Sequence, residues 1–340
     1  MNTLHENGSA LRIALGLASF IIIVAGMKAA ASIIVPFLLS AFIAILCAPL
    51  INSLKSWGMP MWLALATVVI LVALAGSVII SIVGSSIHNF SSQLPEYQSR
   101  LQEQINNLSS WLSARGIDWY DAELQQYINP GVALRFVGRV FNGLGALLAN
   151  GFLIFLTVMF LLFEGVALKD KMKTITGELD DNQTQQTTEF LASVNKYMAI
   201  KSLTSLGTGL LISIWMWILG IDYALLWGLL AFLLNYIPNI GSIIAAIPAV
   251  LLAVVTGGPF IALWVVAGYL LVNTMVGNII EPKFLVDRLG LSTLLVFLSL
   301  VFWGWVLGPI GMLLSVPLTM IVKIGLERNE GTRKIAVLLS

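Results

Sequence analysis

Long apolar runs separated by short polar turns make up most of the chain. Six of them have the length that a helix needs to cross a bilayer: 11–27, 30–51, 61–85, 144–163, 203–219 and 260–280. The pattern predicts an all-α polytopic membrane protein with six to eight transmembrane helices. A second apolar run follows the first at once, so we expect the first to be retained as a transmembrane helix rather than cleaved as a signal peptide.

Two further apolar stretches, 219–255 and 292–324, are too long for a single crossing. A continuous helix from Asp222 to Val255 would be roughly 50 Å long, against roughly 30 Å of hydrocarbon. Proline lacks an N–H and glycine accepts unusual backbone angles, so each stretch is expected to break where these residues occur together. Broken backbone inside a bilayer must be buried in protein or line a cavity. The breaks are therefore expected to be either re-entrant hairpin tips or kinks in full spans.

The distribution of basic residues favours hairpins. With six full spans and a cytoplasmic amino terminus, 13 of the 18 lysines and arginines lie on the cytoplasmic side, against 11 if both stretches cross fully. Both termini are then cytoplasmic, and the two hairpins enter from opposite faces. Transporters built on inverted repeats have this arrangement, with a binding site near the midplane.

The chain divides into five regions along its length. They are three transmembrane helices at 1–85, an amphipathic extramembrane insert at 86–143, a fourth transmembrane helix with a cytoplasmic linker at 144–202, a transport core with both broken elements at 203–325, and a cytoplasmic tail at 326–340.

The insert carries an amphipathic helix, because its apolar positions recur every three or four residues: Phe90, Leu94, Tyr97, Leu101, Ile105, Leu108 and Trp111. We expect this helix to start at Ser91 or Ser92, with Pro95 in its first turn. A short amphipathic piece follows at 119–128, and Pro130 opens a helix leading into the fourth span. The insert has too few apolar residues for its own core, so we expect it to lie on the membrane surface or against a neighbouring subunit.

Composition confirms the membrane class and excludes several functions. Of 340 residues, 58% are hydrophobic and only 10% are charged, whereas a soluble protein carries about a quarter charged residues. The net charge of +1 gives no reason to expect nucleic-acid binding. Cys47 is the one cysteine, and His5 and His88 are far apart, so no metal site or cofactor is expected. There is no phosphate-binding glycine loop and no cluster of catalytic side chains, which argues against an enzyme.

Polar residues at the end of the sixth span form one candidate site. Asn273, Gly277 and Glu281 are spaced four apart, and Asn278 precedes Glu281 by three, so all would lie toward one face of an α-helix. Glu281 could couple transport to a proton or cation. Alternatively it lies at the cytoplasmic interface, where it caps Pro282-Lys283 or pairs with Arg288. Asp222, at another span end, is expected to be interfacial.

The two breaks form the other candidate site. Asn235, Asn239 and Ser242 offer hydrogen-bonding groups without charge, which either contact a polar solute or only satisfy the broken backbone. We therefore name as candidate substrate-binding or gating residues Asn235, Pro238, Asn239, Gly241, Ser242, Asn273, Asn278, Gly308, Pro309 and Gly311, with Glu281 as a possible coupling residue.

Three long stretches resemble the autoinducer-2 exporter family of bacterial membrane proteins. They are WGLLAFLLNYIPNIGS from Trp227, GYLLVNTMVGNIIEP from Gly268, and LGLSTLLVFLSLVFWGWVLGPIGMLLSVPLT from Leu289. The resemblance covers essentially the whole chain. It implies a homo-oligomeric inner-membrane transporter that moves autoinducer-2, a small hydroxylated quorum-sensing signal, out of the cell. Some members of the family are described as sodium(lithium)/proton antiporters, so the resemblance leaves the substrate open.

Overall fold

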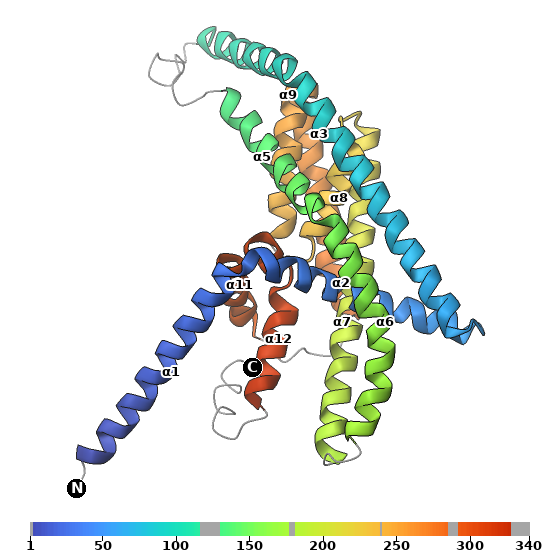
Figure 1. The fold of residues 1–340 in the computed structure, drawn as a ribbon. Helices are drawn as coiled ribbons and strands as arrows, with labels where there is room; N and C mark the ends of the chain where they lie inside the picture. The colour runs from blue at the N-terminus through green and yellow to red at the C-terminus, as the bar shows by residue number, and fades with distance from the viewer. Residues whose placement is uncertain (1–2, 116–129, 177–180, 239, 285–291, 328–340) are drawn as a thin grey trace. The chain divides into compact units, whose positions relative to one another are not determined.

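The structure of the chain, a computed structural model, is built of helices (Figure 1). It describes residues 3–115, 130–176, 181–238, 240–284 and 292–327. No strand occurs among them. Five helices in this part of the chain are long and apolar enough to cross a membrane, or up to six if a bent helix pair counts as one span. The predicted all-α polytopic membrane fold is therefore confirmed, with the number of candidate spans at or just below the low end of the predicted range.

The chain divides into two compact units. One contains residues 1–43 and 290–340, and the other contains residues 44–289. α2 (Ala31–Ser56) runs from the first unit into the second.

In the first unit, α1 (Thr3–Ala29) packs against α11 (Thr293–Leu313), and α11 packs against α12 (Ser315–Glu327). Trp303 Nε1 donates a hydrogen bond to Thr319 Oγ1 at 3.0 Å, which ties α11 to α12. The buried apolar side chains of this unit include Val24, Trp303, Val306 and Leu307.

The second interrupted stretch is broken where the sequence predicts. Gly308 has φ 70° and ψ −155°, a conformation that residues with a side chain avoid, and Pro309 follows it. A Cβ on Gly311 would collide with the backbone of Trp303, although eight residues of straight helix would separate these positions by about 12 Å. The two parts of α11 therefore fold back on each other at Gly308.

In the second unit, α3 (Met61–Ser113) is one continuous helix, so the predicted helix start at Ser91 or Ser92 is wrong. Ser92 Oγ donates to the carbonyl oxygen of Asn89 at 2.9 Å, whereas a capping serine would accept from a backbone N–H. Pro95 lies inside the helix. It removes one backbone donor, and the helix continues because side chains before and after it pack against the same neighbours.

The apolar stripe of α3 packs against α5 (Pro130–Ala149), which starts at the predicted proline. One buried cluster contains Phe90, Tyr97 and Leu101 of α3 with Leu134, Val137 and Phe141 of α5. The amphipathic helix is confirmed, and its apolar face packs on α5 of the same chain, a partner that the sequence analysis did not name. A periodic pattern identifies an apolar face without identifying what covers it. The piece predicted at 119–128 lies outside the described residues.

The predicted fourth span is not straight. α5 ends at Ala149, and α6 (Gly151–Thr176) follows at an angle of 44° to it. The apolar run at 144–163 continues across this bend. The hydrophobicity of a segment indicates an apolar environment, but it does not indicate whether the helix axis changes direction.

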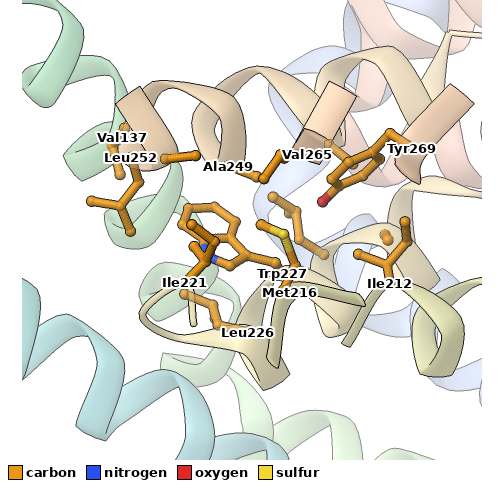
Figure 2. Packing of buried hydrophobic residues seen from close by; sticks show 14 of the residues in the cluster. Val137, Ile212, Met216, Ile221, Leu226, Trp227, Ala249, Leu252, Val265 and Tyr269 are labelled. Carbon is orange, nitrogen blue, oxygen red and sulfur yellow. The ribbon is translucent and has the colours of Figure 1, made fainter. Parts of the chain in front are cut away.

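The largest apolar core surrounds Trp227 (Figure 2). It joins α7 (Asp181–Ile218), α8 (Ala224–Leu234) and α9 (Gly241–Asn273). α9 is kinked at Gly258, which has φ 78° and ψ 177°, so it consists of two helices. Side chains of the core include Ile212, Met216, Leu226, Trp227, Ala249, Leu252 and Val265. α8 is therefore packed against both α7 and α9.

Candidate functional site

The first break follows a helix that is too short to cross a membrane. α8 has 11 residues, which corresponds to about 16 Å, or half of the hydrocarbon thickness. The chain leaves the helix at Asn235 and starts α9 at Gly241, so the predicted break is confirmed. A Cβ on Gly241 would collide with the carbonyl oxygen of Leu234. Only glycine permits this close return of the chain.

Two glycines bring α8 into close contact with α7. A Cβ on Gly209 of α7 would lie 2.8 Å from the carbonyl oxygen of Gly228 in α8. In return, a Cβ on Gly228 would collide with the Gly209 carbonyl oxygen and with Ser213 Oγ. Because the backbones approach so closely, polar groups at the end of α8 can reach side chains on α7.

Asn235, the first residue after α8, binds Ser205 in the middle of a candidate span. Its Nδ2 donates to Ser205 Oγ at 3.0 Å, and both residues are buried. The candidate span of α7 runs from Asn195 to Ile218, so Ser205 lies about 15 Å from its start and about 20 Å from its end. An uncharged polar pair thus occurs near the middle of this candidate span.

The next residue of the break binds the same side of α7 one turn earlier. Tyr236 donates its hydroxyl hydrogen to Ser202 Oγ at 2.8 Å, and Ser202 donates in turn to the Met198 carbonyl oxygen at 2.6 Å. Tyr236 is itself buried. Asn235 and Tyr236 therefore fasten the break to α7 through two serines.

A buried ion pair lies next to these serines. Lys201 Nζ is 2.7 Å from Glu281 Oε1 and 2.9 Å from Glu281 Oε2. Only 5% of the Lys201 side chain and 16% of the Glu281 side chain are exposed. We refer to Lys201, Ser202, Ser205, Asn235, Tyr236 and Glu281 as the mid-span cluster.

The ion pair gives Glu281 a partner that the sequence analysis did not expect. Its partner is Lys201, 80 positions earlier, and not the neighbouring Pro282-Lys283 segment. Arg288, the other expected partner, lies outside the described residues. Lys201 was not predicted as a site residue, because it falls within the region 144–202 that was assigned to the fourth span and a cytoplasmic linker. A signal was present: Lys201, Ser205 and Thr208 recur at helical spacing, and all three are buried.

Glu281 directly follows a π-helix. Residues Thr274–Ile280 form this element, labelled η1, and α10 (Glu281–Phe284) follows. The i→i+5 hydrogen bonds of a π-helix widen each turn only slightly beyond four residues, so positions four apart still lie toward one face. Asn278 is exposed and Asn273 is half-buried, whereas Glu281 turns toward α7. Asn273, Gly277 and Glu281 are all half-buried, and a Cβ on Gly277 would lie 3.5 Å from Asn273 Oδ1, so these positions remain neighbours and their role stays a prediction.

The remaining predicted residues are divided between the two units. Pro238 and Ser242 are half-buried beside the first break, and Asn239 lies outside the described residues. Gly308, Pro309 and Gly311 belong to the first unit. The structure thus brings Asn235 and Glu281 to neighbouring positions on α7, together with three α7 side chains that were not predicted.

The mid-span cluster combines uncharged hydrogen-bonding groups with one ion pair. It offers hydroxyl and amide groups that both donate and accept hydrogen bonds, beside one neutralised ion pair. Within the part of the chain that the structure describes, no group of three or more metal-ligating side chains occurs.

Comparison with known proteins identifies the family. The model of the AI-2E family transporters matches residues 17–330. The chain belongs to the AI-2E transporter family. It is therefore a multi-pass membrane protein of a transporter family, as its apolar helices also indicate.

Two relatives match over nearly their whole length. The AI-2 transport protein TqsA of Escherichia coli (strain K12) is 41% identical over 330 residues, which cover 97% of this chain and 96% of TqsA. A Haemophilus influenzae protein named "Putative transport protein" is 41% identical over 341 residues, 99% of this chain and 98% of that protein. The predicted resemblance to the family is confirmed.

Proposed function

We propose that this protein is an inner-membrane transporter that exports a small polar signalling molecule, and that this molecule is autoinducer-2. The buried Asn235–Ser205 pair at a helix break in mid-span is the observation that carries the proposal. The name of TqsA, a relative of 41% identity, supports the choice of solute. Quorum-sensing signal export would then be the role of the chain.

The mid-span cluster would bind the solute by exchanging hydrogen bonds. The amide of Asn235 and the hydroxyl of Ser205 satisfy each other when no solute is present. A solute hydroxyl can accept from Asn235 Nδ2 and donate to Ser205 Oγ at once, so neither buried group is left unpaired when the solute binds. The chain breaks at Pro238–Gly241 and at Gly308 would act as gates, since interrupted helices can shift without unfolding a full span.

The surroundings that we propose are a bilayer and further copies of the chain. Large apolar side chains on α2 and α3 are exposed, including Phe37, Leu50, Ile70 and Leu74. Lipid or a neighbouring subunit would cover such surfaces. We place both termini on the cytoplasmic side, following the distribution of basic residues.

Replacing Asn235 with alanine tests this proposal. We expect about a tenfold lower rate of autoinducer-2 efflux from proteoliposomes, because one hydrogen bond to the solute and the partner of buried Ser205 are both lost. Asn195→Ala replaces an exposed asparagine of α7, the helix that carries Ser205, and serves as the control that should transport normally. Equal efflux rates for the two variants, with equal amounts of folded protein, would contradict solute contact at Asn235.

The second candidate function, sodium(lithium)/proton antiport, is favoured by the buried Glu281 carboxylate. Lys201 neutralises this carboxylate in the structure, so a metal cation could bind only after displacing the ammonium group. In the same proteoliposomes, a sodium gradient would then drive proton movement, and Glu281→Gln would abolish it. Autoinducer-2 efflux without sodium-driven proton movement would exclude this candidate in favour of the first.

A further inference from the structure

A second polar cluster lies where α3 meets the turn between α7 and α8. The Tyr97 hydroxyl is 3.0 Å from Asp222 Oδ2 and 3.2 Å from the Tyr223 hydroxyl, and it also makes a close hydrogen bond to Gln93 Oε1. The Tyr223 hydroxyl lies 3.2 Å from the same Gln93 oxygen. Two side chains of α3 are thus joined to two residues of the turn, about 130 positions later in the chain.

These four side chains depend on one another. Each tyrosine has a single hydroxyl hydrogen, while Gln93 and Asp222 both present oxygen acceptors to Tyr97. If Tyr97 donates to Asp222, Tyr223 is the member of the cluster that donates to the Gln93 oxygen. Removal of either hydroxyl therefore leaves one acceptor without a donor from within the cluster, and the contact between α3 and the turn is weakened.

Packed aromatic rings support the cluster on its buried side. Phe141 of α5 lies between Phe90, Tyr223 and Trp227, with ring centroids at 4.7, 6.0 and 5.7 Å. Trp227 Nε1 donates to the Asp222 carbonyl oxygen at 2.8 Å. The turn is therefore held from α3, from α5 and from α8 itself.

The turn also contains an unfavourable backbone conformation. Tyr223 has φ 61° and ψ 35°, the left-handed region, and is the one residue other than glycine with a positive φ among those that the structure describes. A bulky side chain disfavours this conformation, which persists only where the surroundings impose it. The hydrogen bonds to Gln93 and Tyr97 supply that constraint.

We propose that Gln93, Tyr97, Asp222 and Tyr223 form a latch that positions Asn235 for transport. α8 is a single short helix with the turn at one end and Asn235 at the other, about 16 Å away. A helix moves as a rigid body over this length, so release of the latch shifts Asn235 relative to Ser205. Tyr97 is thus a positioning residue, and its role in transport rests on the proposed function of Asn235.

The test measures the position of the break without using a substrate. Ser242→Cys, introduced together with Cys47→Ala, gives a protein with one cysteine just beyond the break. We expect Tyr97→Phe to change the rate of labelling of this cysteine by a maleimide about threefold or more. Asp222→Asn should change the labelling rate in the same direction. The double variant should change this rate by little more than either single variant does, because both substitutions remove the same contact.

Tyr269→Phe is the matched control. Its hydroxyl is buried like that of Tyr97, but no hydrogen-bond partner for it occurs among the described residues. Labelling should stay within about twofold of the parent protein. If Tyr97→Phe does not fold, Asp222→Asn carries the test.

Unchanged labelling in the latch variants, additive effects in the double variant, or an equal change in Tyr269→Phe would each overturn the inference. Labelling needs no transported solute, so these results are independent of whether autoinducer-2 is the substrate. A third outcome is a latch variant in which the labelling rate changes but the rate of autoinducer-2 efflux does not. The latch would then position the break without affecting transport, and this result would also overturn the proposal.

Discussion

Lys201→Met should lower the free energy of unfolding by about 3–5 kcal/mol, because it leaves Glu281 as an uncompensated charge in a buried site. Methionine preserves most of the volume of lysine, so the loss of charge dominates the effect. The measurement is thermal or denaturant unfolding of the purified protein in detergent, followed through its helical signal.

Two further variants distinguish the ion pair from general damage to α7. The double variant Lys201→Met with Glu281→Gln should recover most of the lost stability, because no unpaired charge remains. Lys283→Met removes an exposed lysine two positions from Glu281 and should change stability by less than about 0.5 kcal/mol. A Lys201→Met protein as stable as Lys283→Met would show that the pair contributes nothing.

Gly228→Ala should destabilise the protein by about 1–3 kcal/mol, because the new Cβ would collide with the Gly209 carbonyl oxygen and with Ser213. A serine side chain can rotate away, but a backbone oxygen cannot move without shifting α7 from α8. That shift would also separate Asn235 from Ser205, so efflux should fall with stability.

Gly207→Ala is the control for this substitution. It adds the same methyl group to α7, where nothing lies within 4 Å of the new Cβ. The change should be neutral or stabilise the helix by up to about 1 kcal/mol. If both glycine variants unfold at the same temperature, close packing of α7 on α8 is not what requires Gly228.

Much of the fold could be predicted because it follows from local chemistry. The Gly308-Pro309 pair and the Pro238–Gly241 segment break their helices where predicted, since a missing N–H and a positive φ act within one turn. The helix start at Pro130 and the apolar stripe from Phe90 to Leu101 were also predicted for local reasons.

The candidate site was predicted only in part. Asn235 could be named because it is a polar residue at a break in an apolar stretch. Ser202 and Ser205 could not, because their role depends on the close approach of α7 and α8 at Gly209 and Gly228. Asp222 was expected to be interfacial, and its contact with Tyr97 joins positions 125 apart.

The sequence by itself determined that this chain is a helical membrane protein of the AI-2E family, and where its long apolar stretches break. These properties depend on composition and on residues within a few positions of one another. Only the tertiary structure decided which side chains meet: Lys201 with Glu281, Asn235 with Ser205, and Tyr97 with Asp222. Such pairs depend on the three-dimensional path of the chain, because the packing of the helices decides which polar groups come within hydrogen-bonding distance.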